Sequence, residues 1–223
     1  MKLAGLLLAV ILVLQPWPTR GDRDASAFPG IPRHMLLSAY PLRNIGGNNT
    51  GSCFAVGPFT VVTAAHCVDG DGDFEVEARR GQGFGWVSAK LLKRDKNRDV
   101  AVLRLECRLE VTARVAPEDA LEVGDALIAV GFPGPALAPC ASVGYLAGRE
   151  KETRHDEDGN LWQTSNAVFF GNSGGPVFDP RSGLVVGMQT RGAGSAFMGL
   201  APNLAYIVSA KTLRKVLKDA GCE

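Results

Sequence analysis

The chain contains few histidines and carries almost no net charge, and each of these features excludes a class of function. Its 223 residues contain only three histidines and five cysteines, with no Cys-x-x-Cys pair and no His/Cys cluster. Zinc sites need such groups, so we expect neither a metal ion nor a cofactor. The net charge is +1, with no basic field and no acidic tail, so nucleic acid is not an expected partner.

Long apolar runs are also absent, apart from one at the N-terminus. Lys2 precedes an apolar run over Leu3–Leu14, which Pro16 and Pro18 end. The run is about a dozen residues, too short to span a bilayer comfortably. A positive start, a short apolar run and small residues beyond it are typical of a secretory signal peptide, with cleavage within 19–27.

We therefore interpret residues 1–27 as a signal peptide and short leader, and expect a secreted or periplasmic protein without stable membrane insertion after cleavage. An uncleaved anchor is the alternative. In an exported protein, cysteines predict disulfides. Their number is odd, which leaves at least one thiol unpaired within the chain. The five are Cys53, Cys67, Cys107, Cys140 and Cys222.

The remainder of the chain fits one large domain or two small ones. Residues 28–50 are rich in Gly, Pro, Asn and Arg and predict an extended arm with little regular structure. Short apolar runs broken by turns then predict an all-β barrel or sandwich, with two near-equal halves joined around 110–122. The candidate strands are 52–56, 59–63, 73–78, 85–92, 100–106, 126–131, 141–146, 162–165, 176–178, 184–190 and 204–208.

One helix is predicted, at the C-terminus. Ser209 can serve as its N-cap, and Leu213, Val216 and Leu217 follow at helical spacing before Gly221. We interpret this helix as a structural buttress.

The hexapeptide Gly171–Pro176 reads Gly-Asn-Ser-Gly-Gly-Pro. Flanking glycines let Ser173 sit on a sharply turned backbone, where its hydroxyl is exposed and neighbouring N–H groups can converge. A nucleophile that attacks a carbonyl needs this arrangement. A glycine-rich surface turn is the alternative interpretation.

A serine nucleophile requires a base, and histidine has a pKa near neutrality. His66 follows the apolar run 59–62 and small residues, beside Cys67, which places it at a strand-to-turn junction. By contrast, His34 lies in the arm and His155 in a charged stretch. His66 is therefore the predicted base.

The imidazole in turn needs a carboxylate to orient it. Asp99 directly precedes the apolar run Val100–Leu105, so its carboxylate can be partly shielded from water. Asp95 is the second candidate, although it lies among basic residues. A glycine-rich turn contains three further aspartates, which we interpret as turn formers: Asp69, Asp71 and Asp73.

The order His66, Asp99, Ser173 and the surrounding motifs resemble the chymotrypsin-like serine proteases. The motifs are Thr-Ala-Ala-His-Cys, Asp-Val-Ala-Val-Leu and Gly-Asn-Ser-Gly-Gly-Pro. Within that family the chain is similar to bacterial HtrA/Deg-type and glutamyl-endopeptidase-like protease domains. The segments 123–133 and 163–167 carry this second similarity, and the whole resemblance covers roughly residues 52–218.

The resemblance implies two antiparallel six-stranded β-barrels with a C-terminal α-helix and the active site in the cleft between them. The first barrel would occupy about 28–115, the second about 116–208 and the helix 209–220, within a peptidase domain over 28–223. His66 would act as general base and then general acid. The N–H groups of Gly171 and Ser173 would form the oxyanion hole.

Further residues acquire roles only through the resemblance. Thr190 matches the strand that pairs with extended substrate, and its hydroxyl would support Asp99. Cys53 and Cys67 match the disulfide that braces the histidine loop, which leaves the partners of the other three cysteines open. Uncharged residues would line the substrate pocket, and they predict a preference for small or medium uncharged P1 side chains: Ala167, Gln189 and Asn203.

Two departures from the family patterns bear on regulation. In trypsin-type zymogens, cleavage frees an N-terminal ammonium that an Asp beside the catalytic serine receives. Position 172 is Asn instead, so this activation by cleavage is not expected, although Ile45-Gly46-Gly47 resembles such a cleaved terminus. HtrA proteases carry a PDZ domain after the protease, and we expect none here.

The leading hypothesis is thus an exported serine endopeptidase that acts on protein or peptide substrates through an acyl-enzyme. A protease-like binding protein without turnover and an esterase are the alternatives. The oligomeric state stays open.

Overall fold

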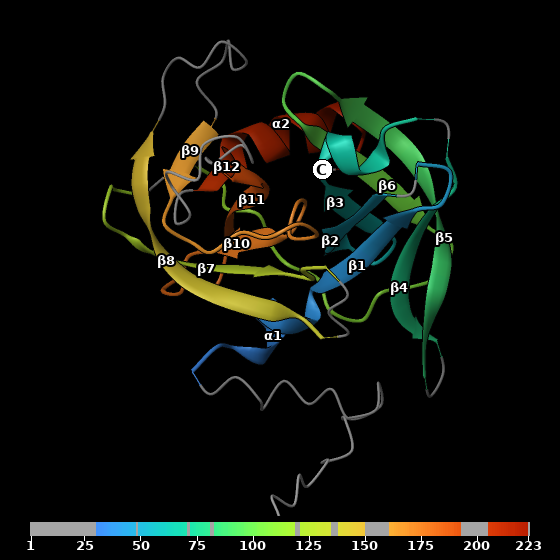
Figure 1. Cartoon of the computed structure of the whole chain (residues 1–223), viewed down its shortest axis with the longest axis horizontal. Coiled ribbons are helices and arrows are strands. Elements are labelled where there is room, and N and C mark those ends of the chain that lie inside the picture. The colour runs from blue at the N-terminus through green and yellow to red at the C-terminus, as the bar shows by residue number, and fades with distance from the viewer. Residues whose placement is uncertain are drawn as a thin grey trace, which may run out of the picture.

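The computed structural model describes residues 30–47, 49–70, 72–80, 83–118, 121–134, 138–149, 161–192 and 205–222. The predicted signal peptide therefore lies outside the described residues. Two β-barrels lie side by side in Figure 1, the first in blue and green and the second in yellow to orange-red.

The first barrel closes in the strand order β1-β2-β3-β6-β5-β4, and every neighbouring pair is antiparallel. Consecutive residues of β2, β3 and β6 are buried, so both faces of these strands are covered. Phe54, Val62 and Leu103 are fully buried there. The strands are β1 (Ala39–Asn44), β2 (Asn49–Gly57), β3 (Thr60–Thr63), β4 (Phe74–Arg80), β5 (Gly83–Asp95) and β6 (Val100–Leu105).

The prediction that residues 28–50 form an extended arm with little regular structure is wrong for most of that segment. Helix α1 (Arg33–Leu37) buries Met35 and Leu36, and β1 pairs with both β2 and β4 to close the barrel. Pro41 lies within β1 opposite Ser52, and proline inside an apolar run argues against a strand. The local pattern therefore conceals an element that barrel closure requires.

The second barrel has the order β10-β11-β12-β9-β8-β7 and is also antiparallel throughout. The predicted all-β fold with two closed six-stranded barrels is confirmed. The strands are β7 (Ala126–Gly131), β8 (Cys140–Arg149), β9 (Leu161–Thr164), β10 (Pro176–Phe178), β11 (Val185–Gly192) and β12 (Ala205–Ser209).

The C-terminal helix α2 (Ala210–Asp219) joins the two barrels. The hydroxyl of Ser209 accepts a hydrogen bond from the N–H of Thr212, so the predicted N-cap is present. Its buried face, with Leu213, Val216 and Leu217, belongs to the same apolar cluster as the first barrel's core. The helix also contacts β11 and β12 of the second barrel, and a smaller cluster fills that barrel's own interior.

Among the described residues, no helix has the length and apolar character needed to cross a membrane.

Candidate active site

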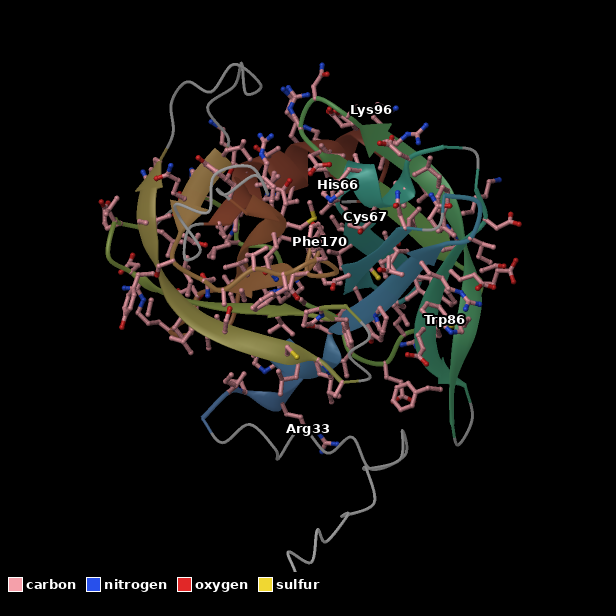
Figure 2. The ribbon with its side chains drawn as sticks, in the orientation of Figure 1. Arg33, His66, Cys67, Trp86, Lys96 and Phe170 are labelled. Carbon is pink, nitrogen blue, oxygen red and sulfur yellow. The ribbon has the colours of Figure 1, made fainter. Side chains whose placement is uncertain are left out.

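His66 lies on the 3₁₀ helix Ala65–Val68, immediately after strand β3. Ala64 and Ala65 are buried, and these small side chains allow the turn to pack against the barrel. The imidazole itself is 47% exposed. Figure 2 shows His66 at the junction of the two barrels, with Cys67 beside it.

Asp99 meets His66 from the turn between β5 and β6. Its φ is 53°, in the left-handed region that Asp and Asn adopt more readily than other side chains. The carboxylate lies 2.8 and 3.0 Å from Nδ1 of His66 and accepts the main-chain N–H of His66 at 3.0 Å. Because a carboxylate only accepts, Nδ1 carries the proton and Nε2 is left as the basic nitrogen.

This pairing has an electrostatic consequence. The hydrogen bond that His66 donates to the Asp99 carboxylate raises the pKa of His66 from its ordinary value of 6.5 to about 10. Cys67 contributes further in the same direction, while partial burial lowers the pKa. An adjacent carboxylate stabilises the imidazolium that forms when histidine takes a proton. The arrangement therefore favours a strong base.

The competing aspartates have other partners. Asp95 accepts hydrogen bonds from the side chain and main chain of Arg98 at 2.8 and 3.0 Å. Asp69 pairs with Lys96 at 3.1 Å. Asp71 lies outside the described residues. Of the carboxylates weighed from the sequence, it is Asp99 that contacts His66.

Ser173 reaches the same cluster through Thr190 of strand β11. The Ser173 hydroxyl donates to the carbonyl of Thr190 at 2.9 Å. The Thr190 hydroxyl in turn donates to Oδ2 of Asp99. In this conformation the Ser173 hydroxyl is directed at the main chain of Thr190.

The backbone around Ser173 presents two N–H groups. Gly171 has φ +96° and lies against Pro133 and Gly134, where a side chain would not fit. The carbonyls that precede the two N–H groups are held, Phe170 O by Gly134 N at 2.7 Å and Asn172 O by Gly175 N at 2.9 Å. In a trans peptide the N–H points opposite to the carbonyl, so the N–H groups of Gly171 and Ser173 point away from these partners.

Ser52 of strand β2 belongs to the site although no motif in the sequence points to it. It is fully buried, and its hydroxyl donates to the carbonyl of Gly171 at 2.7 Å. The two residues are 119 positions apart, so neither local pattern nor spacing could reveal the contact.

The residues predicted to contact substrate differ in exposure. Ala167 is exposed, whereas Gln189 is 2% exposed and its amide nitrogen donates to the carbonyl of Val130 at 3.0 Å. Asn203 lies outside the described residues. Beside the nucleophile, Phe169 and Phe170 are 66% and 94% exposed, and Figure 2 shows Phe170 between the barrels.

The expected disulfide between Cys53 and Cys67 is not present in the structure. None of the five cysteines, which all lie within the described residues, forms a disulfide. Cys53 lies opposite Thr63 with its side chain buried in the first barrel. The strand position that faces Cys67 is two residues earlier, at Gly51, where a Cβ atom would lie 2.6 Å from Sγ of Cys67.

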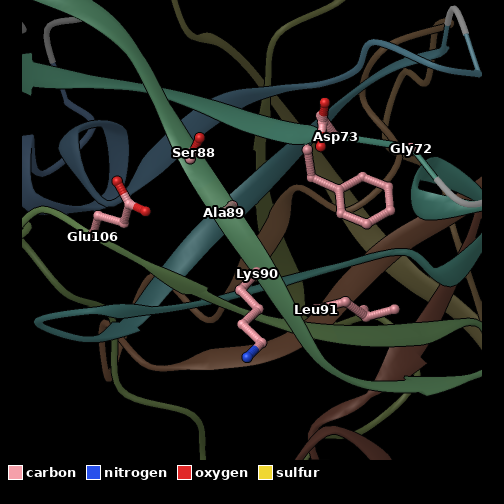
Figure 3. A pocket seen from close by; sticks show the side chains of 8 residues that line it. Gly72, Asp73, Ser88, Ala89, Lys90, Leu91 and Glu106 are labelled. Carbon is pink, nitrogen blue, oxygen red and sulfur yellow. The ribbon is translucent and has the colours of Figure 1, made fainter.

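Two further features lie outside this cluster. A cavity of about 320 Å³ opens on the first barrel (Figure 3), where its lining includes Asp73, Phe74, Lys90 and Glu106 but none of the residues predicted for catalysis. In the part of the chain that the structure describes, no group of three or more His, Cys, Asp or Glu side chains could hold a metal ion.

Comparison with known proteins identifies the family. The model of the trypsin-like peptidase domain matches residues 51–188, which include His66, Asp99 and Ser173. The chain belongs to the trypsin-like peptidase family.

Its curated relatives include bacterial proteases of the HtrA/DegP type and a magnetosome protease. A periplasmic serine protease do/HhoA-like protein of Haemophilus influenzae is 31% identical over 76% of this chain and 34% of its own. A DegP-like periplasmic serine endoprotease of Chlamydia trachomatis is 26% identical over 92% of this chain and 40% of its own. The magnetosome formation protease MamE of Magnetospirillum gryphiswaldense is 32% identical over 72% of this chain and 20% of its own.

The chain thus spans at most about two fifths of the length of these three relatives.

Solved structures agree with the chain in fold. The active form of the Rv3671c protease from M. tuberculosis superposes with a TM-score of 0.72 at 21% identity, covering 100% of this chain and 95% of that one. A serine endoprotease from Yersinia pestis superposes with a TM-score of 0.69 at 19% identity, covering 84% of this chain and 64% of that one. The resemblance stated from the sequence motifs is confirmed at the level of family and fold.

Proposed function

We propose that the protein is an exported serine endopeptidase that hydrolyses peptide bonds through Ser173, His66 and Asp99. The observation that carries the proposal is the connected cluster at the barrel junction. Asp99 holds Nδ1 of His66, and Thr190 links Asp99 to Ser173 through its hydroxyl and its carbonyl. Membership of the trypsin-like peptidase family and periplasmic relatives support the activity and the export.

In the proposed reaction, the Ser173 hydroxyl turns from Thr190 to Nε2 of His66, which takes its proton as Oγ attacks the substrate carbonyl. The N–H groups of Gly171 and Ser173 receive the developing oxyanion. The imidazolium, stabilised by Asp99, then protonates the leaving amine, and an acyl-enzyme forms on Ser173. Water, deprotonated by His66, hydrolyses the acyl-enzyme and restores the serine.

We further propose that substrates are polypeptides with a small or medium uncharged P1 residue. Ala167 and Gln189 place no charge at the predicted pocket, so a charged P1 side chain would lack a partner there. The exposed rings of Phe169 and Phe170 beside the nucleophile supply apolar surface for neighbouring substrate side chains.

The nucleophile is tested with a fluorophosphonate probe and matched variants. We expect the probe to label the wild-type protein and not Ser173→Ala. Ser173→Ala and His66→Ala should each lower kcat on casein by several orders of magnitude, because members of a triad act as a unit. Near-normal turnover by either variant would refute the assignment. Faster hydrolysis of short esters with no cleavage of casein would favour an esterase instead.

The specificity proposal is tested by sequencing the cleavage products of a mixed peptide library. We expect cleavage after small or medium uncharged residues, with few products that end in Arg, Lys or Glu. The Ser173→Ala protein, incubated in parallel, controls for contaminating peptidases. A dominant basic or acidic P1 residue contradicts the pocket assignment and leaves the triad untouched.

A further inference from the structure

Every hydrogen-bonding group of Ser52, in its main chain and in its side chain, has a partner. Its hydroxyl donates to the Gly171 carbonyl at 2.7 Å and accepts from the N–H of Phe132 at 2.9 Å. Its N–H donates to the carbonyl of Ser173 at 2.8 Å, and its own carbonyl accepts from the hydroxyl of Thr63 at 2.7 Å. With 0% exposure, no water competes for these groups.

The bonds from Ser52 hold the peptide units that directly follow Gly171 and Ser173. Ser52 holds the carbonyl oxygens of Gly171 and Ser173, the same two residues whose N–H groups are the proposed oxyanion donors. Glycine adopts positive and negative φ with similar ease, so the peptide after Gly171 can rotate unless it is held. The N–H of Gly134 fixes the preceding carbonyl, that of Phe170. The peptide after Gly171 is held at both of its polar atoms, since the Ser52 hydroxyl fixes its carbonyl and its N–H, on Asn172, donates to Phe169 O at 3.0 Å.

We propose that Ser52 is a positioning residue that locks the Gly171–Ser173 backbone and so keeps the oxyanion hole formed before substrate binds. The proposal rests on the proposed endopeptidase function. Ser52 comes from the first barrel and Gly171 from the second, so the hydroxyl also fixes the nucleophile loop relative to the barrel that carries His66.

The test compares Ser52→Ala with Ser38→Ala. Ser38 is also fully buried, and its hydroxyl also donates to a main-chain carbonyl, that of Met35 at 3.2 Å beside α1. Loss of a single oxyanion donor lowers kcat by about 10²–10³. A misoriented donor keeps part of its effect, so we expect Ser52→Ala to lower kcat by about 10–100-fold with KM nearly unchanged, and Ser38→Ala to leave kcat within about twofold of wild type.

A second measurement separates positioning from general destabilisation. A peptide aldehyde forms a tetrahedral adduct with the Ser173 hydroxyl, and the adduct's oxygen occupies the oxyanion hole, whereas the peptide alcohol of the same sequence has no carbonyl and forms no adduct. We expect Ser52→Ala to lose aldehyde affinity by the same factor as kcat and to keep its affinity for the alcohol. Equal losses for both ligands, or an unchanged kcat in the folded variant, overturn the proposal.

Ser52→Cys, kept under reducing conditions, covers the case in which Ser52→Ala does not fold. Cysteine retains the shape of serine but is a weak donor. A lower kcat with selective loss of aldehyde affinity supports the proposal, and wild-type values for both contradict it. Wild-type turnover and Ser173 labelling are measured first, so a failure of the endopeptidase assignment is distinguished from a failure of the role of Ser52.

Discussion

Asp99 occupies a backbone conformation that few side chains tolerate, and the position of its carboxylate beside His66 depends on that conformation. At φ 53° the chain turns between β5 and β6 so that both carboxylate oxygens reach Nδ1 of His66. Asn accepts the same conformation, whereas alanine at this position is strained. Asp99→Asn therefore removes the charge without disturbing the turn.

We expect Asp99→Asn to lower kcat by about 10³–10⁴, because the amide can stabilise the wrong tautomer of His66 and does not stabilise the imidazolium. In the proposed reaction His66 acts as a base only when its imidazole is neutral, and its raised pKa moves loss of the imidazolium proton to higher pH. The rate constant kcat/KM should therefore rise with pH through a midpoint above 6.5 and below about 10, since water reaches the 47% exposed imidazole.

A pH profile of kcat/KM for both proteins checks this. The midpoint should move to lower pH in Asp99→Asn, since the group that raises the pKa of His66 is gone. Identical midpoints would show that Asp99 does not set the pKa of the base.

Single residues divide into those whose role a local motif predicts and those whose role depends on distant contacts. His66, Asp99 and Ser173 are recognisable because each lies in a short, chemically specific motif, and the structure brings all three to one junction. Ser52 has no such motif because its partners come from the other barrel.

At the scale of elements, the histidine loop is held by packing and hydrogen bonds rather than by a covalent bridge. The resemblance to the family implies a bridge between Cys53 and Cys67, but the strand register decides which side chains face each other. In β2 the position that faces Cys67 is Gly51. Strand β1 escapes sequence prediction for a related reason, since its pairing with β2 and β4 outweighs the local effect of Pro41.

Gly51→Cys should therefore form the bridge that the natural sequence lacks. A Cβ at residue 51 lies 2.6 Å from Sγ and 3.3 Å from Cβ of Cys67, so a shift of a few tenths of an ångström gives disulfide geometry. Under oxidising conditions we expect the bridged protein to gain about 2–4 kcal/mol in the free energy of unfolding.

Urea denaturation with and without reductant measures the effect, and the mass of the disulfide-linked peptides that contain positions 51 and 67 identifies the bridge after digestion of this variant. Gly51→Ala is the control, because it crowds Cys67 equally but cannot form a bond. A reductant-insensitive midpoint in Gly51→Cys would contradict the assigned register.

At the scale of the whole molecule, helix α2 packs against strands of both barrels. Leu213 is fully buried in the cluster that includes the first barrel's core, while the helix contacts β11, the strand that carries Thr190. The double-barrel fold follows from the many short strands and the family motifs, but the path of this buttress between the barrels is visible only in three dimensions.

Leu213→Ala should lower the free energy of unfolding by about 2–5 kcal/mol, since it opens a cavity where the barrels meet. We also expect lower activity, because His66 and Ser173 come from different barrels and depend on their relative placement. Chemical denaturation and kcat on casein give the two values. The exposed Lys215→Ala should change stability by less than about 0.5 kcal/mol, and an equal loss in both variants would contradict the buttress role.

The resting position of the Ser173 hydroxyl has a consequence for inhibitor chemistry. The Thr190 carbonyl that holds it belongs to the strand expected to receive the main chain of an extended ligand. A ligand with a backbone amide can compete for that carbonyl and release the hydroxyl, whereas a small warhead without one must first break a hydrogen bond with a net value of about 0.5–1.5 kcal/mol. Peptide-like covalent inhibitors should thus hold an inherent reactivity advantage of about two- to tenfold over compact reagents of equal electrophilicity.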